Sequence, residues 1–546
     1  MTVGRASRRF AVDRLQVTAD ESGRLVGVTG LRHPDRPYLI EVDLAAPHLD
    51  GRQRSWTTRE VVADADEMTV GLRSNGLEVT LRHSFTAGWT TRLLLRNVAT
   101  APLALPGLRL VVRAASGQRV SALAAGARAC WAVQSCVGDG PLLTARLTAG
   151  SVSSIDDTGF ELGPVRLETD QRYVVQWRWE QLATPRSVVA GPGRDVLVAR
   201  TAYEVDEGVL LPDDPDAALV TPAEVDVDTV EEPAAVGREV SAAVPGRHRI
   251  ELRSAEGDVR LDLSWVAPLA AQLAAWSERA LAGPRTSSGI VVLDGLETAI
   301  VLQAAVGTGS LEDPDQADDA LDRVTSRLLD EGTVDGAAFA PLFLLGEHSR
   351  TGDPEVLDLA LRRSTLLLAR TEPAAPGLGL TLLRAVLAGG GSDQRVIGLV
   401  ADGLARADRG LTGTDLGPDD ELDARCAAAE LELLLAVRPL LSPDHPAGAR
   451  LTALVRRLGA GLGSGLPGTL VAPPSVAEQA YLVAVLRMLP EDGLPAVTRS
   501  WGAPPSLLAQ RATLEVLDRL DDDAEDSNGA AAAGARAWLA LSQRHV

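Results

Sequence analysis

Carboxylates are the most abundant side chains in this sequence that could transfer protons in a reaction. The chain has 546 residues, with 74 Asp and Glu, 7 His and 53 basic residues, and all 53 of these are arginine. The absence of lysine excludes Schiff-base chemistry, a pyridoxal-phosphate anchor and the lysines of Walker A and protein-kinase sites. The chemistry that remains is general acid–base catalysis by carboxylates.

Two short segments place an acid next to a histidine, Glu347-His348 and Asp444-His445. Together with Asp353, the first segment has residue types that can ligate a metal ion. However, it has no HExxH motif and no second histidine four residues on, so a polar loop is the favoured interpretation. We therefore expect no metal and no cofactor.

The first half of the chain carries the pattern of β-strands. Short alternating runs such as Met68–Arg73 and Leu77–His83 flank turn residues, here Asn75-Gly76, which is a strong hairpin signal. Similar runs recur about every ten residues up to Val259–Trp265. This predicts a large antiparallel β-sandwich over residues 1–266. Within it, residues 204–232 hold eleven acids and no arginine, and we expect a solvated insertion between strands.

The second half carries the pattern of helices. Ala270–Leu281 is amphipathic and stops at Gly283-Pro284, so residues 267–284 are predicted to form a linker helix. Helical windows then follow one another through residues 285–546. They are Asp294–Val306, Asp315–Asp330, Val334–Gly346, Pro354–Arg370, Gly377–Leu387, Gln394–Asp408, Pro418–Val437, Pro446–Leu462, Ser475–Leu489, Gly493–Trp501, Ser506–Leu520 and Asn528–Gln543.

Charge and hydropathy narrow the classes of partner. The net charge is −21, of which −15 lies in residues 285–546, so we expect no nucleic acid and no anionic membrane as a partner. We find no secretory signal and no apolar run near the roughly 20 residues of a membrane helix. The expectation is a soluble, cytoplasmic protein.

The order of the elements resembles a known architecture. A β-sandwich, a linker helix and twelve helices is similar to the two-domain glycoside hydrolases and phosphorylases, in which a supersandwich precedes an (α/α)6 toroid. Bacterial glucoamylases and glycogen-debranching enzymes are examples. The segment Leu77–Leu105 resembles strands of such sandwiches, and no catalytic motif of the family is matched. Fold resemblance does not by itself give function.

This resemblance implies a pocket built by the loops that lead from odd to even helices. Glycoside hydrolysis needs two carboxylic groups, about 5–5.5 Å apart in retaining and roughly 6.5–9.5 Å apart in inverting enzymes. The family places them in the fifth-to-sixth and eleventh-to-twelfth loops, which hold Asp393 and Asp521–Asp526 here. The candidate catalytic residues are Asp393, Asp522 and Glu347. The alternative is that these acids cap helices.

Aromatic residues are scarce, at 3% of the chain. The candidate substrate-binding residues are Trp501, as a stacking platform, with His348 and Arg350, although a core position is favoured for Trp501. Trp177 and Trp179 fall on one face of a predicted strand and could bind a ligand or cover a sheet. Two functions stay open: a carbohydrate-active enzyme, if so a glycoside hydrolase acting on an α-glucan or small glycoside, and a non-catalytic binding or assembly protein that keeps this fold.

Overall fold

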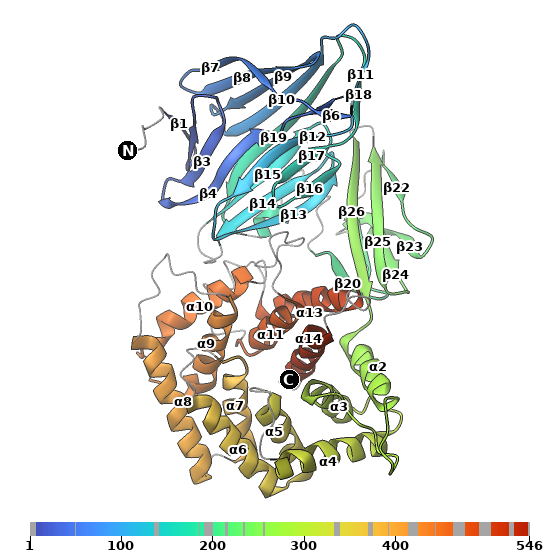
Figure 1. Cartoon of the computed structure of the whole chain (residues 1–546), viewed down its shortest axis with the longest axis vertical. Coiled ribbons are helices and arrows are strands. Elements are labelled where there is room, and N and C mark those ends of the chain that lie inside the picture. Colours follow the sequence, from blue (N-terminus) through green and yellow to red (C-terminus); the bar gives the residue numbers. More distant parts are fainter. Residues whose placement is uncertain are drawn as a thin grey trace. The chain divides into compact units, whose positions relative to one another are not determined.

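The chain divides into two compact units, one built of strands and one of helices (Figure 1). The sandwich unit comprises Met1–Trp265 with Gly465–Pro473, and the ring unit comprises Val266–Ser464 with Pro474–Val546. This order confirms the predicted fold class. The computed structural model describes residues 7–49, 51–135, 141–184, 186–189, 200–212, 217–232, 235–254, 257–331, 339–369, 375–390, 392–412, 424–442, 444–461, 475–490, 504–522 and 529–543.

Two antiparallel sheets form most of the sandwich unit. The seven-stranded sheet has the order β1 (Arg8–Val12), β2 (Leu15–Ala19), β3 (Leu25–Gly30), β4 (His33–Leu44), β12 (Leu108–Ala114), β17 (Gly159–Leu162) and β16 (Ser154–Asp156). The twelve-stranded sheet has the order β22 (Ala218–Val220), β25 (Gly246–Ser254), β26 (Gly257–Val266), β13 (Gln118–Gly126), β14 (Cys130–Ser135), β15 (Leu142–Ala149), β19 (Arg172–Leu182), β10 (Trp89–Asn97), β9 (Leu77–Ser84), β8 (Glu67–Ser74) and β7 (Thr57–Ala63), with β20 (Ala202–Glu204) paired to β26.

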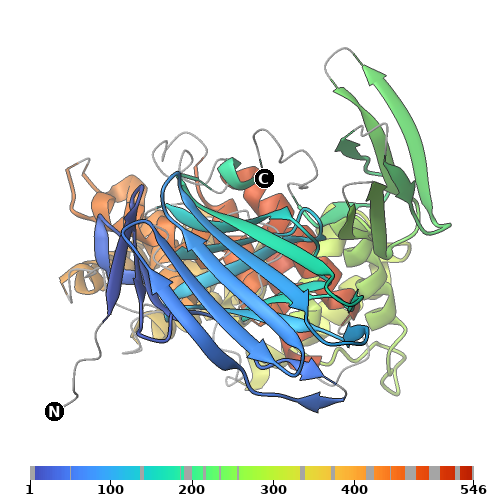
Figure 2. The same cartoon turned by 90° about the horizontal axis from the view of Figure 1, so that it is seen from above.

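The strand pattern follows from local sequence. Figure 2 shows β8, β9 and β10 side by side with β19, in the order of the twelve-stranded sheet. Ser74 pairs with Leu77, so Asn75 and Gly76 form the predicted two-residue turn, with φ of 39° and 85°. Asparagine and glycine tolerate this left-handed region, which matches the twist of the flanking strands. The predicted strand Asp195–Ala202 lies mostly outside the described residues.

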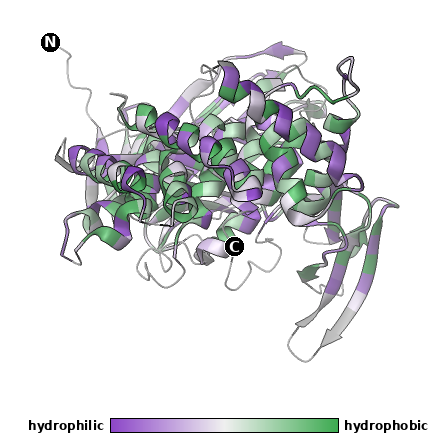
Figure 3. Ribbon diagram, turned by 90° about the horizontal axis from the view of Figure 1, so that it is seen from below, coloured by the Kyte–Doolittle hydropathy of each residue, from purple (hydrophilic) through white to green (hydrophobic). Residues whose placement is uncertain are grey.

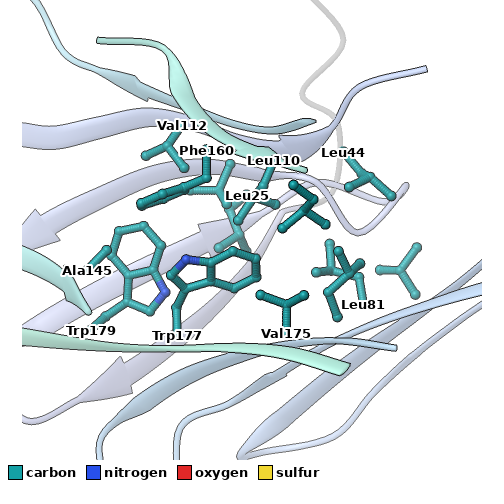
Figure 4. Close-up of a cluster of buried hydrophobic side chains, with 14 of the residues drawn as sticks. Leu25, Leu44, Leu81, Leu110, Val112, Ala145, Phe160, Val175, Trp177 and Trp179 are labelled. Atoms are coloured by element: carbon teal, nitrogen blue, oxygen red, sulfur yellow. The ribbon is translucent and has the colours of Figure 1, made fainter. Parts of the chain in front are cut away.

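Large apolar side chains fill the space between the two sheets. Figure 4 shows Phe160 and Leu110 on the strands of one layer facing Trp177 and Trp179 on the other. Trp177 and Trp179 are 0% and 1% exposed, so both belong to the core rather than to a sheet surface. Each fully buried aromatic removes a large apolar area from water, which makes this cluster the main stabilising element of the unit.

Three small sheets complete the sandwich unit, and one of them involves the acidic segment. They are β5 (His48–Leu49) with β6 (Arg52–Gln53), β11 (Leu103–Leu105) with β18 (Val165–Leu167), and β21 (Val209–Pro212) with β24 (Ala235–Ala242) and β23 (Val225–Glu232). Residues 204–232 therefore contribute strands themselves. Asp226 and Asp228 on β23 are exposed to solvent. A short helix, α1 (Arg186–Val189), also lies in this unit.

The ring unit consists of inner and outer helices. The inner helices are α3 (Leu296–Thr308), α5 (Phe339–Thr351), α7 (Leu378–Ala388), α9 (Ala424–Val437), α11 (Val476–Arg487) and α14 (Gly529–Ser542). The outer elements are α2 (Leu269–Leu281), α4 (Pro314–Glu331), α6 (Pro354–Ala369), α8 (Gln394–Thr412), α10 (Ala447–Gly461), α13 (Pro505–Asp522) and the 3-10 turn η1 (Arg438–Leu440). The predicted helix Gly493–Trp501 lies outside the described residues.

The inner helices contact one another in a closed cycle: α3 with α5, α5 with α7, α7 with α9, α9 with α11, α11 with α14, and α14 with α3. An inner helix is surrounded by other helices, so it must bury every face, and its sequence is apolar all round. In α11 all eight residues from Gln479 to Leu486 are buried. Figure 3 shows helices that carry both hydrophilic and hydrophobic residues, as expected for outer helices, in which one face packs inward and the other faces solvent. Among the described residues, no helix is both long enough and apolar enough to span a membrane.

Candidate functional site

A cavity of about 570 Å³ lies within the ring unit, at the C-terminal ends of three inner helices. Its polar lining residues come from four elements: Gln303 and Thr308 of α3, Ser349 and Arg350 of α5, Arg384 of α7, and Gln543 directly after α14. Leu345, Leu387 and Val306 add apolar wall. The ends of α3, α5 and α7 lead into α4, α6 and α8, so these are odd-to-even connections of the kind that the family resemblance implied.

The polar wall is organised around two buried residues, Gln303 and Glu347. Gln303 is 3% exposed and lies in the otherwise apolar helix α3. Its amide nitrogen donates to the Phe343 carbonyl at 3.1 Å and to Glu347 Oε1 at 2.5 Å. Because a buried amide without partners would be costly, these bonds fix the side chain at the cavity wall.

Glu347, which is buried, and Arg350, which is half-buried, form an ion pair one helical turn apart on α5. Glu347 is 0% exposed, and Arg350 donates to its Oε2 from Nε at 3.0 Å and from Nη2 at 2.6 Å. Arg350 also pairs with Asp318 at 2.9 Å and with Asp322, both on α4. Burial opposes the charge of Arg350, but its bonds to Glu347 and Asp322 outweigh this and raise the pKa of the guanidinium.

This network determines what the cavity can accept. Arg350 and Arg384 line the cavity. The three acids that pair with Arg350, namely Glu347, Asp318 and Asp322, are not among its lining residues. The three carboxylates more than balance the two guanidinium groups, so a neutral ligand suits this wall better than an anion. None of the described residues that line the cavity is a carboxylate.

The structure places three predicted site residues on α5. We predicted that this helix ends at Gly346, but it continues to Thr351, so Glu347 is a buried helical residue rather than a loop residue. Arg350 lines the cavity. His348 Nδ1 lies 2.8 Å from the backbone oxygen of Asp353 and so links α5 to the turn before α6.

Asp393, another predicted catalytic residue, is not among the described residues that line this cavity. Asp393 precedes α8, where its Oδ1 accepts a hydrogen bond from the backbone nitrogen of Arg395 at 2.8 Å. The Arg395 side chain also bonds Asp393, and these bonds hold the pKa of that carboxyl below its ordinary value. Asp393 therefore acts as a helix cap, which is the alternative weighed for such acids. Trp501 and the side chain of Asp522 lie outside the described residues.

The direction of α14 places its N-terminal end away from the cavity. Gln543, after the C-terminal end of α14, lies at the cavity, and the Leu541 carbonyl accepts a hydrogen bond from Arg384 at 3.4 Å. Fourteen helical residues span about 21 Å, so the N-terminal end of α14, which the chain reaches soon after Asp522, lies far from the cavity. Asp393 follows the cavity residue Ala388 by five positions.

Toward the N-terminal ends of α5 and α7, the interior of the ring is filled. Tyr481 and Trp538 are buried, with ring centroids 4.8 Å apart, and Phe339 packs 4.9 Å from Trp538. These aromatic side chains therefore cannot stack on a sugar in the cavity. Among the described residues, no group of three or more His, Cys, Asp or Glu is placed to hold a metal ion.

Glu432 of α9 is buried beside this aromatic cluster. It accepts hydrogen bonds from the backbone nitrogens of Gly377 and Leu380, each at 2.9 Å, and from the Tyr481 hydroxyl at 2.7 Å. It thus caps the N-terminus of α7 from another helix. Burial raises the pKa of Glu432 to about 7, against these hydrogen bonds. Gly379 lets α7 approach this closely, because a Cβ there would lie 2.3 Å from the Glu432 carbonyl oxygen.

Sequence reasoning missed Gln303, Arg384, Gln543, Glu432 and Tyr481. One signal could have found two of them, a single polar residue within an apolar helical run, as in IVLQAA for Gln303 and LELLLA for Glu432. Such a residue must find a partner on another helix. The sequence does not show which residue is that partner, because the partner depends on how the inner helices pack in the ring.

Comparison with known proteins identifies solved structures of similar fold but does not assign this chain to a family. No protein-family model and no curated protein sequence matches this chain. Among solved structures, a polysaccharide lyase is similar with a TM-score of 0.62 at 10% identity, over 94% of this chain and 93% of that chain. At this identity the likeness shows a shared fold and nothing about activity.

Two bacterial α-2-macroglobulins also align along this chain. The protein from E. coli has a TM-score of 0.28 at 10% identity and covers 98% of this chain and 51% of that chain. A Salmonella variant has a TM-score of 0.27 at 10% identity and covers 97% and 45%. These scores are too low to indicate a shared fold.

Proposed function

We propose that this chain is a saccharide-binding protein with the fold of a carbohydrate-active enzyme, and that its ring cavity holds the end of a neutral saccharide without hydrolysing it. The observation that carries the proposal is the lining of the cavity, which offers amides, hydroxyls and guanidinium groups and, among the described residues, no carboxylate. Hydrolysis requires two carboxylic groups on either side of the glycosidic bond.

The lining suits a hydroxylated ligand in size and in hydrogen bonding. A volume of about 570 Å³ is in the usual range for small-molecule pockets. The Ser349 hydroxyl donates to the Leu345 carbonyl at 3.0 Å and can still accept from a ligand hydroxyl. Leu387 is 71% exposed at the rim, where it can cover the apolar face of a sugar ring. The similarity to a polysaccharide lyase fits this assignment as an analogy of fold.

The proposal predicts that the chain binds a neutral saccharide and does not cleave it. A glycan array followed by calorimetry tests this prediction. The full-length chain is applied to neutral oligosaccharides, and reducing ends and unsaturated products are assayed in parallel. Ser349→Trp fills the cavity from an exposed position and should weaken binding by about tenfold or more. Ala401→Trp, at an exposed position of α8, is the matched control and should bind like the wild type.

The outcomes separate the two functions that the sequence left open. Saccharide binding that is lost in Ser349→Trp, with no released product, supports a binding protein. Release of reducing ends by the wild type would contradict the proposal and support a glycoside hydrolase. Failure of every neutral saccharide to bind, or equal binding by Ser349→Trp, would contradict it as well.

A further inference from the structure

A second cavity, of about 530 Å³, lies at one end of the sandwich unit. Two tight turns of the seven-stranded sheet border it, Asp13-Arg14 between β1 and β2 and Leu31-Arg32 between β3 and β4. The opposite wall is the end of β19 in the twelve-stranded sheet, near Trp179 and Gln181. This cavity uses none of the residues of the ring cavity.

The two turns bring two arginines together. The backbone nitrogen of Leu31 donates to the Arg14 carbonyl at 2.8 Å, so Arg14 and Arg32 occupy neighbouring positions at the rim. Both side chains are exposed, and within the described part of the chain neither guanidinium group has a hydrogen bond or an ion pair. Two unpaired guanidinium groups at one cavity form an oxyanion site.

The same cavity also offers acceptors for hydroxyl groups. The Gln181 amide nitrogen donates to the Tyr38 hydroxyl at 3.2 Å, which leaves the amide oxygen of Gln181 as an acceptor. The Tyr38 hydroxyl donates to the Pro141 carbonyl at 2.9 Å and so holds the two sheets in register at this end. The carboxylate of Asp13 is a further acceptor. Asp13 has a φ of 52°, a left-handed conformation that aspartate adopts in tight turns.

A rigid indole forms the inner wall. Trp179 stacks on Trp89 with ring centroids 4.3 Å apart and donates from Nε1 to the Thr91 hydroxyl at 3.0 Å. Arg178 and Glu180 also border this stretch of β19, but they alternate with Trp179, so their side chains belong to the opposite face of the sheet. The recognition groups are therefore Arg14, Arg32, Asp13 and Gln181.

We propose that this cavity binds a small hydroxylated organic anion, a sugar acid or a sugar phosphate. Arg14 and Arg32 hold the carboxylate or phosphate oxygens, while Asp13 and Gln181 accept hydrogen bonds from the hydroxyl groups of the ligand. The indole of Trp179 closes the cavity toward the core. The two cavities thus differ in ligand charge, a neutral saccharide in the ring unit and an anion in the sandwich unit.

Calorimetry on the full-length chain at low ionic strength tests this, with glucuronate, glucose 6-phosphate and glucose as probes. We expect one of the two anions to bind, which identifies the oxyanion, and glucose not to bind at this cavity. Arg14→Gln and Arg32→Gln should each weaken anion binding by about tenfold, and the double variant should abolish it. Binding should also weaken as salt is raised.

Two controls make the result specific. Arg172→Gln removes the same charge at the other end of β19, about 23 Å along the strand from Trp179, and should not change affinity. Ser349→Trp, the ring-cavity variant, should bind the anion normally, so this proposal can fail or succeed independently of the proposed function. Binding of neither anion, or undiminished binding by a double variant that melts like the wild type, would refute the proposal.

Discussion

The two units bury their polar groups in different ways. In the sandwich unit, His83, Thr91 and Trp179 form a neutral chain, in which Trp179 Nε1 donates to the Thr91 hydroxyl and that hydroxyl lies 3.0 Å from His83 Nδ1. In the ring unit, the buried polar groups include two acids, Glu347 and Glu432. A hydroxyl, an imidazole and an indole can share hydrogen bonds in an aromatic core without any charge, whereas a buried carboxylate needs a guanidinium group or a helix N-terminus.

This difference follows from the geometry of the two cores. Facing sheets leave a layer about 10 Å thick that large aromatic side chains can fill. Closely packed inner helices bring the end of one helix next to the side of another, as where Glu432 of α9 caps α7. The two units should therefore respond to pH in opposite directions, and each can be followed separately. Six of the nine tryptophans precede residue 266 and report on the sandwich, whereas helical circular dichroism reports on the ring.

The largest effect is expected at Glu347. Glu347→Gln leaves Arg350 in place without its buried counter-charge, which typically costs about 3–5 kcal/mol. Asp318 and Asp322 still contact Arg350, so we expect a loss near the lower value. Urea denaturation followed by helical circular dichroism measures it. Glu355→Gln, an exposed acid at the start of α6, is the control and should change stability by less than about 0.5 kcal/mol. Equal stability of the two variants would show that the ion pair contributes nothing.

The next largest effect is the acid sensitivity of the sandwich unit. Burial lowers the pKa of His83 to about 3, from an ordinary value of 6.5. Between these values the unfolded chain binds a proton that the folded unit excludes, so stability falls as the pH falls below 6.5. The slope approaches about 1.4 kcal/mol per pH unit, or roughly 3 kcal/mol between pH 6.5 and 4. Tryptophan fluorescence during denaturation at several pH values should show this slope, and His83→Gln should remove it.

A smaller effect of opposite sign is expected in the ring unit. Burial raises the pKa of Glu432 to about 7, from an ordinary value of 4.5. In this window the folded unit keeps a proton that the unfolded chain releases, so stability falls as the pH rises, by about 2 kcal/mol between pH 5 and 6.5. Glu432→Gln should reduce the dependence measured by helical circular dichroism, and Glu515, whose pKa burial also raises to about 7, should account for what remains. If the ring instead gained stability over this range in the wild type, the assignment to Glu432 would be wrong.

The fold could be predicted from sequence because its signals are local. Alternation in Leu77–Ser84 and the Asn75-Gly76 turn define a hairpin without reference to the rest of the chain. The same holds for α2, where the apolar spacing and the Gly283-Pro284 stop lie within one segment. Local patterns do not fix where a helix ends against its neighbours, which is why α5 continues past Gly346 and buries Glu347.

The cavities could not be predicted in the same way, because residues distant in the sequence form them. Gln303, Arg384 and Gln543 line one space only because α3, α7 and α14 meet in the ring. Arg14 and Arg32 meet because two turns share a backbone hydrogen bond. In neither case do residue type and spacing carry a motif. Acids favour helix starts, and Asp393 occupies such a position before α8.

The smallest effect is expected at Asp393, the residue that an acid–base mechanism would make the most important. Its carboxylate caps α8 and pairs with Arg395 at the surface, and asparagine caps a helix about as well as aspartate. Surface ion pairs contribute little, so Asp393→Asn should lower the melting temperature only slightly. Saccharide binding should be unchanged, because Asp393 is not among the residues that line the cavity. A loss of ligand binding, or of any product release, in this variant alone would contradict the contrast between acids that cap helices at the surface and buried acids that hold the ring together.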